Sequence, residues 1–141
     1  MHARARARAG IARPGAGAIL VVDDDPMCCR LMVAALEFDG HRVDWTTVPA
    51  QALDLVRKKH YSVVVSDVNM PSMLGTALAA EVGRLCPTAR MILVSAFADG
   101  QVHAAARALG SALLAKPFQV DALTAAVRDL LRDPDEQRAV P

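Results

Sequence analysis

The sequence predicts an α/β sandwich built around a five-stranded parallel sheet. Short apolar runs without charged residues alternate along the chain with segments in which apolar residues recur every three or four positions. The runs are typical of strands buried on both faces of a parallel sheet, and the periodic segments are typical of helices that cover such a sheet. The alternation therefore predicts five strand–helix units joined by right-handed crossovers.

Four continuous apolar runs are the strongest strand candidates. They predict strands at residues 18–22, 61–65, 91–94 and 112–115. The segment 42–46 alternates apolar and polar residues instead, so we expect a strand at an edge of the sheet there.

The intervening segments carry apolar stripes at helical spacing. The first stripe is expected to hold Cys28, Leu31, Ala35 and Phe38, and the later ones Ala52, Leu55 and Val56, then Leu78, Val82 and Leu85, then Val120, Leu123, Val127 and Leu130. Gly40 and Gly110 stand where helices are expected to end. The segment 99–109 is rich in alanine and less clearly amphipathic.

Length and composition limit the class of protein. With 141 residues, 53% of them apolar, the chain can bury one substantial core and is not disordered as a whole. The longest stretch without a charged residue, 68–80, is too short to span a bilayer, so no transmembrane segment is expected. The three cysteines include no Cys-x-x-Cys pair, so we expect neither a disulfide framework nor a zinc site, and a cytoplasmic location.

Charge is unevenly distributed along the chain. Residues 1–13 hold four arginines and no acid, whereas the remainder has 12 basic and 15 acidic side chains. Because the domain itself is mildly acidic, nucleic-acid binding is not expected of it. We expect flexible tails at 1–16 and 133–141 around one domain at 17–132, and a basic arm that contacts nucleic acid or anionic lipid is the alternative interpretation of the first tail.

Polar side chains follow the predicted strands at the points where the strands end. Asp23 and Asp24 follow the first run, Asp67 the third strand, Ser95 the fourth and Lys116 the fifth. The carboxyl ends of parallel strands share one edge of the sheet, which is where open α/β sheets bind ligands. Clustered carboxylates suit Mg²⁺, and a lysine with a hydroxyl suits a phosphoryl group. The sequence thus predicts Mg²⁺-dependent phosphoryl transfer onto an aspartate.

Four segments together resemble the receiver domain of two-component response regulators. These segments are ILVVDDDP, VVVSDVNMPSMLG, ILVSA and LLAKPF, in that order along the chain. The resemblance covers residues 17–132 and implies a flavodoxin-like (βα)5 fold with strand order 2-1-3-4-5. It also implies a signalling protein that catalyses only its own phosphorylation and slow dephosphorylation, and not a metabolic enzyme.

The resemblance assigns a role to each matching residue. It makes Asp67 the phosphoryl acceptor and Asp23 and Asp24 the acid pair that holds Mg²⁺, the second of them directly. The backbone carbonyl of Asn69 would complete the protein ligands of the metal. Ser95 would supply the hydroxyl that follows the phosphoryl group, and Lys116 would contact a phosphoryl oxygen. The resemblance further implies a cis peptide bond before Pro117, and Asp25 is expected only to cap the first helix.

Three positions depart from the family pattern. Leu113 stands where the family often has an aromatic residue whose rotamer follows the hydroxyl residue, so that means of signalling is absent. Leu74 replaces an aspartate that often precedes the glycine, here Gly75, and this aspartate is not a metal ligand. Phe97 stands two residues after Ser95, where it would shield the acyl phosphate from water and slow hydrolysis.

The resemblance implies partners of two kinds. A histidine kinase or a histidine phosphotransfer protein would donate the phosphoryl group, and an unknown protein would respond, with a phosphorylation-dependent homodimer left open. No output domain is recognisable after residue 132, so we expect a stand-alone receiver or one cut from a longer chain. Two alternatives are a haloacid-dehalogenase-type phosphatase, in which Asp23 and Asp25 would act while Asp67 stays unexplained, and a receiver fold kept only as a scaffold.

Overall fold

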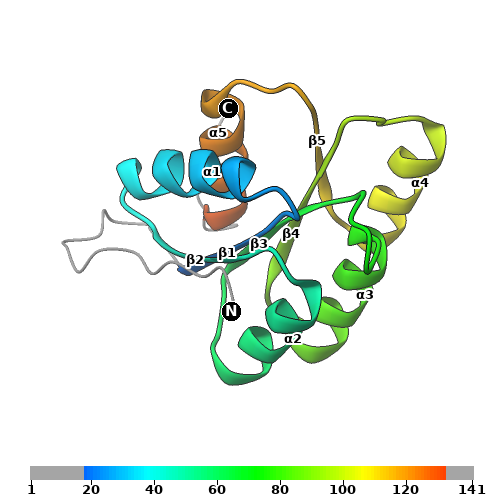
Figure 1. Ribbon diagram of the computed structural model, residues 1–141, viewed down its shortest axis with the longest axis horizontal. Coiled ribbons are helices and arrows are strands. Elements are labelled where there is room, and N and C mark those ends of the chain that lie inside the picture. The colour runs from blue at the N-terminus through cyan, green and yellow to red at the C-terminus, as the bar shows by residue number, and fades with distance from the viewer. Residues whose placement is uncertain (1–17, 133–141) are drawn as a thin grey trace.

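Five parallel strands form one sheet in the order β2-β1-β3-β4-β5, and a helix follows each strand (Figure 1). This computed structural model describes residues 18–132. The strands are β1 (Ala18–Val22), β2 (Arg42–Thr46), β3 (Val63–Asp67), β4 (Arg90–Ser95) and β5 (Ala112–Ala115). The helices are α1 (Pro26–Phe38), α2 (Pro49–Lys58), α3 (Gly75–Leu85), α4 (Gly100–Leu109) and α5 (Val120–Leu131). The architecture is the expected flavodoxin-like sandwich with the expected strand order.

The helices cover both faces of the sheet. Helices α1 and α5 lie on one face, and α2, α3 and α4 lie on the other (Figure 1). Alternate residues of β1 therefore enter two separate cores: Ile19 and Val21 pack with α1 and α5, whereas Leu20 and Val22 pack with α2 and α3. This double burial explains why β1 reads as a continuous apolar run.

Most predicted strand positions are confirmed. The strands predicted at 18–22, 42–46 and 112–115 have the predicted bounds, and β2 lies at an edge of the sheet. The third strand begins two residues later than predicted, because Tyr61 precedes it as a buried core side chain. Gly40 and Gly110 have left-handed backbones just after α1 and α4, as expected of glycines that end helices.

The apolar stripe predicted for the first helix is wrong. The buried side chains of α1 are Cys29, Met32, Val33 and Leu36, whereas Leu31 is 58% exposed and Phe38 is 86% exposed. Both sets have helical spacing, because α1 is apolar on nearly all sides. The sequence pattern therefore could not indicate which side of the helix faces the sheet.

The burial predicted for the last strand is also wrong. All but the last residue of β5 are half-buried and Ala115 is exposed, because β5 is an edge strand with β4 as its only neighbour. On the adjacent helix α4, only Ala106 is fully buried. The alanine-rich pattern of this segment already indicated a helix with a weak apolar face.

A buried carboxylate ties the edge strand β2 to the end of α2. Asp44 accepts hydrogen bonds from the hydroxyl of Tyr61 at 2.6 Å and from Nζ of Lys59 at 2.8 Å. We expect Tyr61→Phe to lower the free energy of unfolding by about 2 kcal/mol, because a hydrogen bond to a buried charged group is lost. Urea denaturation measures this, and the loss should shrink in an Asp44→Asn background. An equal loss in both backgrounds would mean that the bond is not its cause.

The sequence also predicts that no segment crosses a membrane and that both ends of the chain are flexible tails. In the described part of the chain, no helix combines the length and the apolar character that crossing a bilayer requires. The tails expected at 1–16 and 133–141 lie outside the described residues.

Candidate functional site

The strand ends bring together the side chains singled out in the sequence. Strand β3 lies between β1 and β4, with Val22 level with Ser66 and Asp67 level with Val94. Strand β5 lies beyond β4, with Ala115 level with Ser95. Residues from the first and the last strand therefore reach one edge of the sheet, the carboxyl edge, as parallel strands require.

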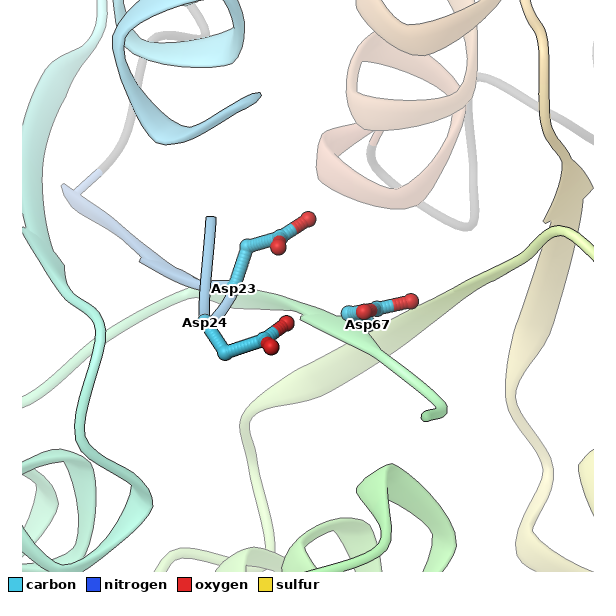
Figure 2. Close-up of side chains that lie close together, drawn as sticks. All are labelled: Asp23, Asp24 and Asp67. Carbon is cyan, nitrogen blue, oxygen red and sulfur yellow. The ribbon is translucent and has the colours of Figure 1, made fainter. Parts of the chain in front are cut away.

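Three carboxylates form a cluster at the carboxyl edge. Asp23 and Asp24 follow β1, Asp67 ends β3, and one carboxylate oxygen from each lies within 4.8 Å of the others. Figure 2 shows the three side chains close together beyond the strand ends. Asp23 and Asp67 are buried, whereas Asp24 is exposed.

Lys116 brings a positive charge from β5 to this cluster. Its Nζ lies 3.2 Å from Oδ2 of Asp23 and 3.6 Å from Oδ1 of Asp67. Its backbone N–H donates to the carbonyl of Ser95 at 2.8 Å, and the peptide bond to Pro117 is cis, as the resemblance implied. The two ends of this ion pair, Asp23 and Lys116, lie 93 residues apart in the sequence.

Burial and mutual repulsion raise the affinity of the cluster for protons. Burial raises the pKa of Asp67 above its ordinary value, and the nearby Asp23 carboxylate raises it further. Burial also raises the pKa of Asp23, although the backbone N–H of Asp25 and the Lys116 ammonium offset part of the effect. Burial alone would lower the pKa of Lys116, but Asp23 and Asp67 outweigh it and raise that pKa. Lys116 is therefore charged, and one ammonium faces several carboxylates.

Local bonds fix the loop that carries the acid pair. Asp23 Oδ1 accepts the backbone N–H of Asp25 at 2.9 Å, and the backbone N–H of Asp23 donates to the carbonyl of Thr46. Asp25 caps α1 by accepting the N–H of Met27 at 2.9 Å, as predicted. The buried thiol of Cys29 donates to the carbonyl of Asp23, and burial raises the pKa of Cys29 to about 12, so it acts as a neutral packing group.

Ser95 and Asn69 complete the predicted set. Ser95 ends β4, is fully buried, and accepts the backbone N–H of Phe97 at 3.0 Å through its hydroxyl. Asn69 lies in the loop two residues after Asp67, so its backbone is held near the same edge. Its role as a metal ligand stays a prediction.

Gly75 is a supporting residue whose role the sequence reasoning missed. A Cβ atom at this position would lie 2.2 Å from the carbonyl oxygen of Asp67 and 2.8 Å from Cα of Val68. Its backbone N–H donates to the carbonyl of Val68 at 2.8 Å. The first residue of α3 thus packs directly against the backbone of Asp67. A glycine that opens a predicted helix shortly after a site aspartate was the available signal.

The arrangement suits a divalent cation and a phosphoryl group. The three carboxylates provide the oxygen donors that Mg²⁺ prefers, and Lys116 is the one ammonium within ion-pair distance of Asp23 and Asp67 among the described residues. A divalent cation would relieve the repulsion among the carboxylates. Lys116 and the Ser95 hydroxyl offer donors on the side of Asp67 that faces β4 and β5.

Comparison with known proteins agrees with this geometry. The profile of the response regulator receiver domain matches residues 19–128. The transcriptional regulatory protein ZraR of Escherichia coli K12 is 32% identical over 114 residues, which cover 80% of this chain and 26% of ZraR. The chain thus spans about a quarter of the length of ZraR from this and related bacteria.

Solved structures of similar chains share the fold. A CheY-like response regulator receiver domain protein from Methanospirillum hungatei superimposes with a TM-score of 0.79 at 26% identity, over 87% of this chain and 97% of that one. The BeF3-activated receiver domain of DrrB from Thermotoga maritima gives a TM-score of 0.75 at 25% identity, over 82% and 97% of the two chains. Receiver domains are signalling domains of two-component systems and not metabolic enzymes. On its sequence, its fold and the acidic cluster at its carboxyl edge, the chain belongs to the response regulator receiver domain family.

Proposed function

We propose that the chain accepts a phosphoryl group on the carboxylate of Asp67 from a phosphohistidine of a histidine kinase or a histidine phosphotransfer protein. The observation that carries the proposal is the position of Asp67, buried at the carboxyl edge beside both the Asp23–Asp24 pair and the Lys116 ammonium. Among the described carboxylates, Asp23 shares both the cluster and the contact with Lys116, but its Oδ1 already accepts the backbone N–H of Asp25.

The reaction requires an in-line exchange of one bond. An oxygen of Asp67 forms a bond to phosphorus while the bond between phosphorus and the histidine nitrogen breaks, and the imidazole leaves with a proton from solvent. Bound Mg²⁺ would neutralise charge on the transferring phosphoryl oxygens. Asp23, Asp24 and the carbonyl of Asn69 would hold it, and Lys116 would contact a further phosphoryl oxygen.

Ser95 would connect the phosphoryl group to the surface. Its hydroxyl oxygen accepts the N–H of Phe97, which leaves the hydroxyl hydrogen to donate to a phosphoryl oxygen, and a shift of Ser95 toward that group would move the start of the β4–α4 loop with it. The segments that follow are loosely packed, since α4 buries one residue fully and β5 is half-buried. We infer that the response reaches a downstream protein through α4 and β5. Since Leu113 stands where the family often has an aromatic residue, this response would not depend on an aromatic rotamer.

Intact mass spectrometry tests the proposal. After incubation with acetyl phosphate and Mg²⁺, we expect one phosphoryl adduct on the wild-type chain, none with EDTA, and none on Asp67→Asn. Absence of the adduct under conditions that label a known receiver domain would support the scaffold alternative, and an adduct on Asp67→Asn would move the acceptor to another residue.

Phe97 provides a prediction about the lifetime of the phosphorylated state. Its side chain is 75% exposed beside Ser95, so it is free to cover the loop over the acyl phosphate. We expect Phe97→Glu to raise the rate of autodephosphorylation severalfold, because a carboxylate admits and orients water where the ring excludes it. The decay of the adduct over time measures this rate, and equal rates would remove Phe97 from this role.

A further inference from the structure

Helix α1 carries a second apolar stripe on the side that faces away from the sheet. We call it the outer seam and define it by Met27, Leu31, Ala34 and Phe38, which are all exposed. Three of the seven exposed large apolar side chains in the described part of the chain lie on it. At about 100° of rotation per residue, the outer seam is centred opposite the buried stripe of the same helix.

The spacing of the outer seam is the one that packs a helix against another helix. Its members follow one another by four, three and four positions, as the a and d positions of a heptad do in a coiled coil. The buried residues of α1 then occupy the b, c and f positions, which point toward the sheet. Covering the sheet requires only one apolar stripe, so the outer seam indicates a helical partner outside the domain.

The charges beside the outer seam match a second copy of the same helix. Arg30 and Glu37 lie at g positions on one flank of the seam, and neither forms an ion pair among residues 18–132. Two helical turns, about 10 Å, separate them, so they do not pair within one helix. In two antiparallel helices g positions face g positions, so Arg30 of each copy meets Glu37 of the other. A parallel pairing would place Arg30 against Ala35 instead.

The side chains of the outer seam also fit the same antiparallel pairing. Met27 would face Phe38 of the second copy, and Leu31 would face Ala34, so no two bulky rings meet. A hollow of about 350 Å³ lies between the first half of α1 and the β5–α5 loop. Another, of about 420 Å³, lies between the second half of α1 and α5. Each end of the seam therefore has space beside it for the larger side chain that the second copy brings.

We propose that the chain forms a homodimer in which the α1 helices of two copies pack antiparallel along their outer seams. A two-fold axis between Leu31 and Ala34 makes this contact isologous, so it closes at two copies. The contact is small, with one helix of 13 residues from each copy, so the dimer is weak and exchanges with monomer. A helix of another protein is less favoured, because only a second copy necessarily brings the matching Glu37 and Arg30.

Sedimentation equilibrium of the full chain from about 5 to about 500 μM tests the proposal. We expect the average mass to rise from that of one chain toward that of two, with a Kd of roughly 10 to 100 μM. Leu31→Glu should weaken dimerisation about tenfold or more, because it places a charge in both central layers of the seam. Leu74→Glu is the matched control, because Leu74 is 56% exposed against 58% for Leu31 and lies outside α1. Its Kd should stay within about twofold of wild type.

A charge exchange distinguishes this dimer from other assemblies. Arg30→Glu and Glu37→Arg should each raise the Kd about threefold to tenfold, because each sets like charges against each other at two symmetric places. The double variant Arg30→Glu/Glu37→Arg should return the Kd to within about twofold of wild type, since both opposite pairs form again. The two residues do not contact each other within one chain, so this rescue requires a second copy.

Several outcomes would overturn the proposal. These are a mass that stays at one chain throughout the concentration range, equal weakening by Leu31→Glu and Leu74→Glu, and a double charge variant that dimerises no better than the single ones. A monomeric chain that binds a histidine phosphotransfer protein through Leu31 would assign the outer seam to that partner instead. Asp67→Asn should dimerise as the wild type does, so failure here is separate from failure of phosphoryl acceptance.

Discussion

Gly75→Ala is expected to lower the free energy of unfolding by about 3 kcal/mol, or roughly 10 °C in Tm. The added Cβ would stand 2.2 Å from the carbonyl oxygen of Asp67, and all three of its nearest contacts are backbone atoms of Asp67 and Val68. Backbone cannot move aside as a flexible side chain would. Either α3 shifts away from the sheet or the end of β3 moves, and the second outcome displaces the acceptor carboxylate.

The same substitution should impair phosphoryl acceptance, by as much as about 100-fold if Asp67 shifts by about 1 Å. Gly83→Ala is the matched control, because Gly83 lies in the same helix with nothing within 4 Å of its Cβ position. That variant should be stabilised by up to about 1 kcal/mol and should accept phosphoryl groups normally. Thermal melts and rates of adduct formation compare the two, and similar behaviour of both variants would remove the steric account.

Mg²⁺ is expected to raise Tm at neutral pH, and Asp67→Asn to raise it without Mg²⁺. In the wild type the pKa of Asp67 is raised on folding, so the folded state holds its proton more tightly than the unfolded chain does. The protonated carboxyl is compatible with folding, and the stability it contributes at low pH is lost as pH rises through the raised pKa. At pH 7 the neutral asparagine avoids this loss, and we expect a gain of about 1 kcal/mol.

The pH dependence of the stability difference between Asp67→Asn and wild type separates the effect of the Asp67 charge from other effects of the substitution. The difference between Asp67→Asn and wild type should disappear as pH falls below about 3, where the aspartate is protonated in both states. At ten times its Kd, Mg²⁺ should stabilise the wild type by about 1.4 kcal/mol, and should stabilise Asp67→Asn less, since a ligand is lost. A variant less stable than wild type at pH 7, or one equally stabilised by Mg²⁺, would contradict the account.

The strands and the candidate site could be predicted because both follow from one-dimensional patterns. A continuous apolar run indicates a doubly buried strand, and the rule that parallel strands end at one edge brings Asp23 and Lys116 together across most of the domain. That rule needs no distance and no side-chain detail. It placed Asp67 near the lysine, which the structure finds at 3.6 Å.

The remaining features depend on geometry that no local pattern records. The side of α1 that faces the sheet was mistaken because Leu31 and Met32 are equally apolar, and only packing distinguishes them. The contact of Gly75 with Asp67 depends on how a loop returns α3 to the sheet. Arg42 and Arg90 are distant in sequence and begin strands at one edge of the sheet only because of the strand order, which no local pattern records.

The weak packing of α4 and β5 has a consequence for the order in which the native state opens. Strand β1 has hydrogen-bonded neighbours on both sides and is almost completely buried, whereas β5 has one neighbour and four residues. Backbone amides of β1 and β3 should therefore exchange with deuterium only through global unfolding. Those of α4 and β5 should exchange through local openings, which require less free energy than global unfolding. The domain would then combine a rigid half that holds the carboxylates with a soft half whose exchange rates report any ligand at the carboxyl edge.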